Sequence, residues 1–322
     1  MATLPERELV SATCLEAVTS SASMVMAAMS LQTSAGLSSM TEPTTLLTGL
    51  VFGEQPRWHD DRLWFSDWGT REVIAVDVEG TSEVVLRAPS FPCCVDWLPD
   101  GRLVVVSGRE GLLLRREADG SLVTHADLGT ASTPAAGNEL VVDGRGNAYV
   151  NGGGFDLMAG EPFAPGVVTL VAPDGSTRQV ADDLAFPNGM LVTPDNGTLI
   201  VAESYAKRLT AFDVAADGSL SNRRVWADLG DGVPDGICLD AEGAVWYGDV
   251  PNRRCVRVRE GGEVLQTIEL DRGCFACALG GADRRTLFMM ATEWNGPENM
   301  FAGPRTGQVL AVDASAPGVG WP

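Results

Sequence analysis

From residue 51 onward, hydrophobic and polar positions alternate in short runs that return in the same order along the chain. Each unit consists of a short apolar strand, a turn with Asp or Gly, a second apolar strand and a more polar hairpin. β-branched and aromatic runs bounded by Asp-Gly or related pairs are typical of β-hairpins. The turn and second strand recur six times, at residues 59–66, 99–106, 143–150, 194–201, 240–247 and 282–289.

The spacing of these units predicts the architecture. The copies recur every 40–51 residues, about the length of a four-stranded propeller blade. No long helical segment separates the strands, which argues against parallel α/β folds. The pattern therefore predicts an all-β fold, a six-bladed β-propeller with four-stranded antiparallel blades. A further strand at residues 44–51 precedes the first copy, and we expect it to complete the last blade and close the ring without an exposed edge.

Residues 1–39 lie outside the repeat. The stretch 17–31 is mildly apolar and uncharged, but three glutamates and one arginine precede it, the wrong sign for a secretory signal. The regular pattern begins after Met40. We expect an extension that is helical or disordered, followed by a propeller over residues 40–322, in a cytoplasmic protein.

Charge and cysteine usage narrow the function classes. Lys+Arg 23 against Asp+Glu 43 gives a formal net charge of −20. So acidic a chain repels nucleic acid and anionic membranes, and we expect neither as a partner. The sequence contains no apolar run of ~18 residues, so no membrane span is expected. The chain has seven cysteines, and an odd number does not suggest a disulfide framework. Cys274 and Cys277 have the spacing of a zinc-ligand pair, but the sequence offers no second pair to complete a zinc site. With two histidines, multi-histidine zinc sites and most Ser-His-Asp machinery are disfavoured.

Polar residues recur at matching positions of the predicted innermost strands, ten or eleven residues before the second-strand core of the first five units. These residues are Glu54, Cys94, Asn138, Asn188 and Asp235. Equivalent positions of inner strands converge on the propeller axis, where buried carboxylates and amides need a partner. One hard cation with oxygen ligands satisfies them together, which favours Ca²⁺, then Mg²⁺ or Mn²⁺, over Zn²⁺.

The alternative for two of these positions is local. The Pro-Asn-Gly tripeptide at Asn188 and the Pro-Asp-Gly tripeptide at Asp235 are ordinary turn sequences. Glu54 has no turn signature, however, and turns do not explain why the positions recur in register. We therefore interpret the set as a metal site.

The motifs Gly-Glu-x-Pro-x-Trp at residues 53–58, Phe-Pro-Asn-Gly at 186–189 and Pro-Asp-Gly-Ile-x-Leu-Asp at 234–240 resemble the senescence marker protein/gluconolactonase/luciferin-regenerating-enzyme family. The resemblance extends from about residue 45 to the end of the chain. It implies a six-bladed propeller with one catalytic divalent cation in the central channel, held by Glu54, Asn188 and Asp235. It also implies that Asn138 lines the site and that Asp235 is the catalytic acid/base.

One departure from the family concerns the substrate. Sugar-lactonase members carry an arginine two residues before the third-blade asparagine, whereas the corresponding residue here is Ala136. The other residues expected near the mouth are Trp68, Phe91, Cys93, Phe155, Met158, Phe275 and Trp294. We expect Asn138, Cys93, Phe155 and Trp294 to bind a small-molecule substrate that is less polar than a sugar lactone.

The resulting hypothesis is a metal-dependent hydrolase that opens a lactone or cleaves an ester. No serine lies in a Gly-x-Ser-x-Gly elbow, which disfavours a covalent acyl-enzyme. Phosphotriester hydrolysis or a non-hydrolytic rearrangement in the same channel is an alternative, and so is a binding propeller with a structural metal. Asp67, Glu203 and Asp249 end second strands, and the sequence leaves open whether they orient metal ligands or lie in solvent.

Overall fold

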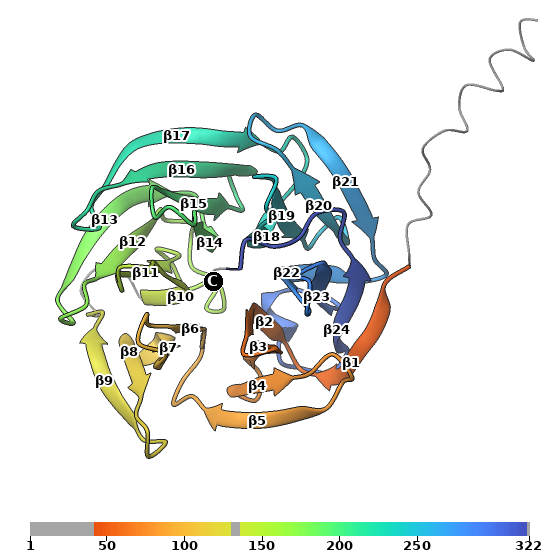
Figure 1. The fold of residues 1–322 in the computed structure, drawn as a ribbon, viewed down its shortest axis with the longest axis horizontal. Helices are drawn as coiled ribbons and strands as arrows, with labels where there is room; N and C mark the ends of the chain where they lie inside the picture. Colours follow the sequence, from red (N-terminus) through yellow and green to blue (C-terminus); the bar gives the residue numbers. More distant parts are fainter. Residues whose placement is uncertain (1–41, 130–135, 321–322) are drawn as a thin grey trace, which may run out of the picture. The chain divides into compact units, whose positions relative to one another are not determined.

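The computed structural model describes residues 42–129 and 136–320. These residues form six four-stranded antiparallel sheets arranged as blades around a central axis (Figure 1). The predicted six-bladed propeller is confirmed. The two described helices are short 3-10 turns, and neither has the length and hydropathy needed to cross a bilayer. The predicted extension at residues 1–39 lies outside the described residues.

In the first five blades, the strands follow one another in sequence order from the axis outward (Figure 1). The first two blades consist of β2 (Gly53–His59), β3 (Arg62–Asp67), β4 (Glu72–Val76) and β5 (Ser82–Arg87), and of β6 (Val95–Trp97), β7 (Leu103–Ser107), β8 (Leu112–Arg116) and β9 (Leu122–Asp127). The third and fourth consist of β10 (Ala136–Val142), β11 (Ala148–Gly152), β12 (Gly166–Val171) and β13 (Thr177–Leu184), and of β14 (Pro187–Val192), β15 (Thr198–Glu203), β16 (Arg208–Val214) and β17 (Leu220–Asp228).

The last two blades differ in how they are completed. The fifth consists of β18 (Pro234–Leu239), β19 (Val245–Asp249), β20 (Arg254–Val258) and β21 (Val264–Glu269). The sixth contains β22 (Gly273–Gly280), β23 (Thr286–Thr292) and β24 (Gly307–Asp313), and its outer strand is β1 (Thr44–Leu50). β1 pairs antiparallel with β24, from Thr44 opposite Ala311 to Leu50 opposite Gly307. The predicted closure by the N-terminal strand is therefore confirmed.

Aromatic side chains pack between neighbouring blades. Trp58 of the first blade stacks on Phe288 of the sixth, with ring centroids 5.4 Å apart and planes 8° apart. His59, also of the first blade, stacks on Trp97 of the second blade, with ring centroids 4.0 Å apart. Removing such large apolar surfaces from water is the main favourable term that holds blades of separate sequence together.

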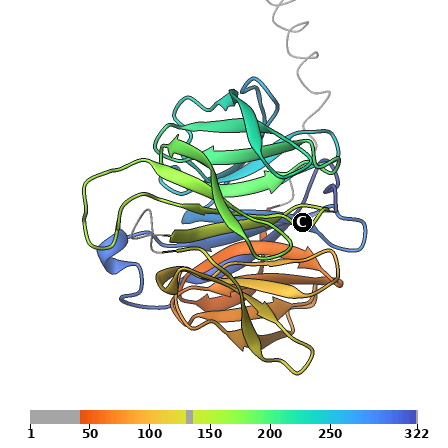
Figure 2. The same ribbon diagram turned by 90° about the vertical axis from the view of Figure 1, so that its left-hand side faces the viewer.

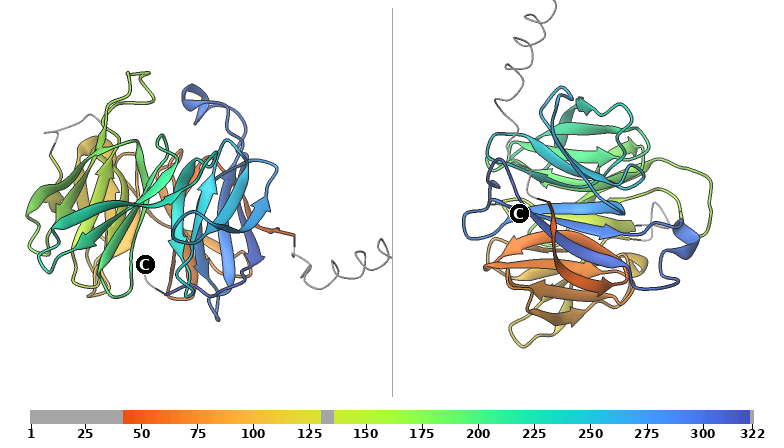
Figure 3. Two further views of the ribbon diagram at one scale, coloured as in Figure 1. Left: turned by 90° about the horizontal axis from the view of Figure 1, so that it is seen from above. Right: turned by 90° about the vertical axis from the view of Figure 1, so that its right-hand side faces the viewer.

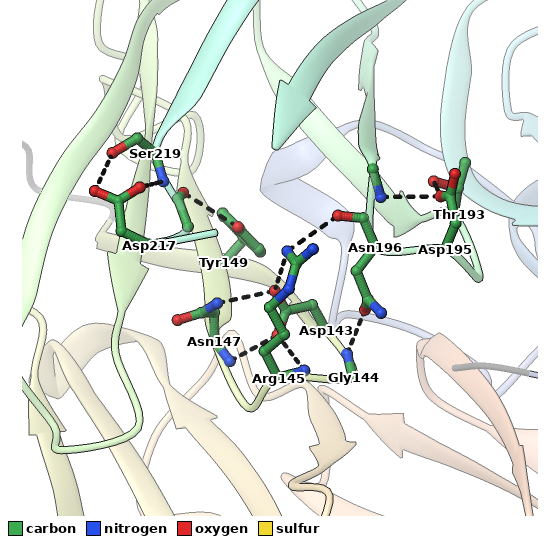
Figure 4. Close-up of polar contacts among 12 residues, drawn as sticks. Asp143, Gly144, Arg145, Asn147, Tyr149, Thr193, Asp195, Asn196, Asp217 and Ser219 are labelled. Atoms are coloured by element: carbon green, nitrogen blue, oxygen red, sulfur yellow. Dashed lines mark hydrogen bonds and ion pairs between the residues drawn. The ribbon is translucent and has the colours of Figure 1, made fainter. Parts of the chain in front are cut away.

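The Asp-containing turns that marked the repeat are stabilised by side-chain hydrogen bonds (Figure 4). In the third blade, Oδ1 of Asp143 accepts hydrogen bonds from the backbone N–H groups of Arg145 and Asn147, at 2.9 and 2.8 Å. Oδ1 of Asn196 in the next blade accepts a hydrogen bond from Gly144 N–H at 2.6 Å. Aspartate stabilises these turns because its short side chain bonds to its own backbone two residues on. Here, one turn also links two blades.

Two long connections project from the same face of the propeller, as Figures 2 and 3 show. One is the loop 153–165 between β11 and β12, and the other is the segment 293–306 that contains η2 (Pro297–Asn299). The C-terminal segment lies toward the opposite face, where Gly318 pairs with Asp240. The face with the two long loops is the one at which the inner strands begin.

Candidate functional site

The inner strands share an irregularity near their first residues, which explains why matching positions were found in the sequence. The pairing register shifts within the segments 54–57, 136–140, 187–190, 234–237 and 274–276. Such bulges change the direction in which a side chain points and are frequent next to active sites. Glu54, Asn138, Asn188 and Asp235 each lie in or beside one of them. In the sixth blade, the equivalent residue is Phe275, and in the second blade β6 begins one residue after Cys94.

The structure brings most of the predicted site residues to one cavity of about 420 Å³. The polar residues that line it include Glu54, Asn138, Asn188 and Asp235. The predicted aromatic contacts Phe155 and Trp294 line it as well, from the two projecting loops. Trp68, Phe91, Met158 and Phe275 complete the set that was expected near the mouth.

Cys93 is the exception, because it does not line the cavity. Its side chain is fully buried, and burial raises the pKa of its thiol to about 12. Its carbonyl oxygen accepts a hydrogen bond of 2.9 Å from Nε1 of Trp68, whose ring lines the cavity instead. The neighbouring Cys94 is also buried and donates its thiol hydrogen to the Asn138 carbonyl oxygen at 2.8 Å.

The two Pro-x-Gly tripeptides are strands rather than turns. Asn188 lies within β14 and Asp235 within β18, which are inner strands of adjacent blades. A Cβ atom on Gly189 would lie 2.6 Å from the carbonyl oxygen of Asp235, and one on Gly236 would lie 2.4 Å from Cβ of Ala276. These glycines are required because the inner strands approach each other closely. The turn interpretation is wrong for both tripeptides.

Three carboxyl groups, two of which line the cavity, raise one another's pKa. Burial raises the pKa of Glu54 well above its ordinary value, and the charges of Asp235 and Glu139 raise it further, against a hydrogen bond of 3.1 Å from Gln55 N–H. Burial and then Glu139 also raise the pKa of Asp235. Burial raises the pKa of Glu139 to about 7, opposed chiefly by Arg57. Buried like charges of this kind favour protonation, or a bound cation that compensates them.

The donor set fits a divalent cation with oxygen ligands. Oδ1 of Asp235 is buried and has no hydrogen-bond partner among the described residues. Nδ2 of Asn188 faces Oγ of Ser204 at 3.5 Å, which leaves the amide oxygen available as a ligand. The described residues contain no group of three or more His, Cys, Asp or Glu side chains arranged for a metal. A cation here would be held by carboxylate and amide oxygens together, which suits Ca²⁺ or Mg²⁺.

Two residues that the sequence analysis missed position Asn188. Oγ of Ser204 donates a hydrogen bond of 2.7 Å to the carbonyl oxygen of Pro234 and faces the Asn188 amide. Nδ2 of Asn151 donates a hydrogen bond of 2.6 Å to the Asn188 carbonyl oxygen, while its Oδ1 accepts one from Glu139 N–H at 3.1 Å. Both residues lie at the end of a second strand, and no motif marks them in the sequence.

The strand-end carboxylates are buried rather than solvated. Asp67 accepts hydrogen bonds from the backbone N–H groups of Val51 and Phe52, at 2.9 and 3.1 Å. Glu203 accepts one from Ala185 N–H at 2.7 Å. Both therefore hold the segment that leads into an inner strand. Asp249 instead forms an ion pair with Arg254 at 2.9 Å. Their hydrogen bonds go to backbone groups, arginines, Thr210 and Asn252 rather than to the metal-ligand candidates.

The cavity wall is largely apolar and contains several aromatic rings. Phe186 has a positive φ of 60°, a strained value for a large side chain, and immediately precedes Pro187. Its ring stacks on Tyr205, with centroids 4.8 Å apart and planes 14° apart. Arg109 is the single basic side chain among the described residues of the lining. The segment 135–139 around Asn138 contains no basic residue, and no motif marks Arg109, which reaches the lining from the second blade.

Comparison with known proteins identifies the family. Residues 52–293 match the family model described as the SMP-30/Gluconolactonase/LRE-like region, so the chain belongs to this family. The chain is 26% identical over 282 residues to the 6-deoxy-6-sulfogluconolactonase of Pseudomonas putida, covering 84% of this chain and 94% of that protein.

Solved structures show the same fold. A gluconolactonase from Xanthomonas campestris is 26% identical, with a TM-score of 0.67 over 83% of this chain and 88% of that one. A regucalcin from Agrobacterium tumefaciens, described as a calcium-binding protein, is 21% identical, with a TM-score of 0.72 over 88% and 97% of the two chains. The predicted family membership is confirmed.

Proposed function

We propose that this protein is a metal-dependent hydrolase that opens a lactone, or cleaves an ester, less polar than a sugar lactone. The observation that carries the proposal is that the carboxylates of Glu54 and Asp235 line one cavity together with several aromatic rings, and that a buried Asp235 oxygen has no hydrogen-bond partner among the described residues. The names of the two relatives that are 26% identical, a sulfogluconolactonase and a gluconolactonase, support lactone hydrolysis.

Glu54, Asn188 and Asp235 would hold the cation, and Ca²⁺ suits their oxygen ligands best. When bound, such a cation polarises the substrate carbonyl and lowers the pKa of water. Asp235 accepts a proton from the attacking water and returns it to the leaving alkoxide oxygen. Ser204 and Asn151 keep Asn188 in place by the hydrogen bonds described above.

The remaining lining residues bind and orient the substrate. Asn138 supplies polar contacts beside the carboxylates, while Phe155 and Trp294 cover the apolar part of the substrate and exclude water. Trp68, whose indole N–H is held by the Cys93 carbonyl, provides the contact that was expected of Cys93 itself. An aromatic wall with few hydrogen-bonding groups stabilises alkyl or aryl substituents better than hydroxyl groups, which would lose their water.

A substrate screen with metal-stripped protein tests the proposal. Protein treated with EDTA and then reloaded with Ca²⁺, Mg²⁺, Mn²⁺ or Zn²⁺ is assayed on lactones of graded polarity. We expect turnover only after reloading, with a higher kcat/KM for alkyl lactones than for sugar lactones. The opposite ranking would refute the specificity. A binding propeller would gain melting temperature from the metal without any turnover, and a phosphotriesterase would cleave phosphotriesters but no lactone.

A further inference from the structure

The charged groups of the cavity are unevenly placed. Glu54, Asp156 and Asp235 contribute acidic side chains, and Arg109 contributes the basic one. Arg109 belongs to η1 (Gly108–Glu110), the 3-10 turn after β7 in the second blade. Arginines beside the strand ends of other blades pair with carboxylates, as Arg208 does with Glu203 at 2.9 Å. The Arg109 guanidinium has no carboxylate partner in the described part of the chain.

Aromatic stacking holds this guanidinium in position. Its central carbon lies 4.4 Å from the centroid of the Phe91 ring. Phe91 in turn packs edge-on against Phe301, with centroids 5.0 Å apart. A stacked guanidinium has one face covered, while its N–H groups point outward in the plane and remain free to donate. The neighbouring Glu110 does not neutralise it, because Glu110 accepts a hydrogen bond of 2.8 Å from Ser107 Oγ.

The backbone that carries Arg109 packs against the strand of Asn138. A Cβ atom on Gly108 would lie 2.6 Å from the carbonyl oxygen of Gly137, and Gly108 N–H donates to the Pro92 carbonyl oxygen at 2.8 Å. This close contact between the second and third blades holds η1 next to the residue that precedes Asn138, a lining residue of the cavity. Arg109 is therefore an exposed side chain that the backbone contact of η1 and the stacking on Phe91 hold at the cavity.

We infer that the site takes an organic anion: a lactone or ester with an apolar body and a carboxylate that binds Arg109. This inference rests on the proposed function. Glu54 and Asp235 repel an anion unless a cation covers them, so the substrate carboxylate binds at the rim and the scissile carbonyl lies toward the acidic end. A planar guanidinium matches a carboxylate with two parallel hydrogen bonds. Because Arg109 is exposed, water screens this ion pair in part, and the two parallel hydrogen bonds act together with the apolar contacts of the substrate body.

Matched substrates test the inference. The rates for an alkyl γ-lactone and for the γ-lactone of equal length with a terminal carboxylate are compared in the metal-loaded protein. We expect the carboxylated lactone to have a kcat/KM at least about tenfold higher, and Arg109→Gln to reduce that ratio about tenfold, mainly through KM. Arg109→Glu is expected to reverse the preference. Arg259→Gln removes one positive charge from a residue outside the cavity and should leave the ratio unchanged.

A binding experiment separates failure of the inference from failure of the proposed function. Calorimetric titration with 4-phenylbutyrate and with its uncharged amide needs no turnover. We expect the acid to bind more tightly than the amide, and Arg109→Gln to abolish its binding. This result supports the anion site even if the protein hydrolyses no lactone or ester. If the protein hydrolyses the charged and uncharged lactones at equal rates, and Arg109→Gln changes neither rate, the inference is overturned and the proposed function stands.

Discussion

The backbone of Gly189 lies against that of Asp235, so close that a Cβ atom on this glycine would lie 2.6 Å from the Asp235 carbonyl oxygen. The contact joins the inner strands β14 and β18 immediately after Asn188. Two ligand candidates from separate blades are therefore held side by side by main-chain packing. Metal affinity should depend on this contact as well as on the ligand side chains.

We expect Gly189→Ala to push the two strands apart. The added methyl group has no free space, and overpacking of this kind costs ~1–3 kcal/mol of stability. The variant should melt at a lower temperature and bind Ca²⁺ more weakly, measured by calorimetry. Gly153→Ala is the control, because its Cβ would lie 3.6 Å from the Phe186 ring, an ordinary contact. Wild-type Ca²⁺ affinity in Gly189→Ala would show that the strand contact does not position the ligands.

Asp235→Asn should separate metal binding from catalysis. An amide oxygen still coordinates a cation, so we expect the fold and most of the metal affinity to remain. The loss of the base should lower kcat by about 10²-fold or more. Circular dichroism, Ca²⁺ titration and steady-state rates measure the three effects separately. Hydrolysis at the wild-type rate would remove Asp235 from the mechanism.

Glu54→Gln should act mainly through metal affinity. The substitution removes one of the two carboxylates and keeps an oxygen at the same position. We expect a higher apparent Kd for Ca²⁺ and low activity that added Ca²⁺ partly restores. Activity measured against Ca²⁺ concentration gives the result. If activity stays low when Ca²⁺ binding is saturated, Glu54 has a role in the reaction beyond holding the cation.

Glu139 should make the metal-free protein less stable as the pH rises. Its pKa of about 7 in the fold lies above the ordinary 4.5, so the folded state binds more protons than the unfolded state between these values. Stability is therefore lost as the pH rises through 7. In Glu139→Gln, the difference in unfolding free energy between pH 5 and pH 8 should shrink by up to about 3 kcal/mol. Urea unfolding in EDTA measures it, with exposed Glu263→Gln as the control, and an unchanged difference would contradict the assignment.

Deleting residues 1–39 should leave the propeller intact. The six blades are complete within residues 43–320, because β1 (Thr44–Leu50) supplies the outer strand of the last blade. We expect the truncated protein to keep the melting temperature and hydrolytic rate of the full chain, by calorimetry and steady-state assay. A drop of several degrees would show that the extension contributes to stability.

The sequence by itself determined the repeat, the number of blades, the closure by residues 44–51 and the register of Glu54, Asn138, Asn188 and Asp235. These features are local or periodic. Strand alternation and a turn that contains Asp are visible in each copy, and the six-fold repetition then places equivalent residues at equivalent points of the ring.

Only the tertiary structure decided which side chains line the cavity. It showed that Gly189 and Gly236 serve close strand packing, that Cys93 is buried behind Trp68, and that Arg109 enters the lining from the second blade. It also brought Ser204 and Asn151 to Asn188. The physical reason is that bulges set the direction of a side chain, and contacts between blades set its neighbours. The contacts of Trp68 with Cys93, of Ser204 with Asn188 and of Asn151 with Asn188 join residues 25, 16 and 37 positions apart, further than any single motif extends.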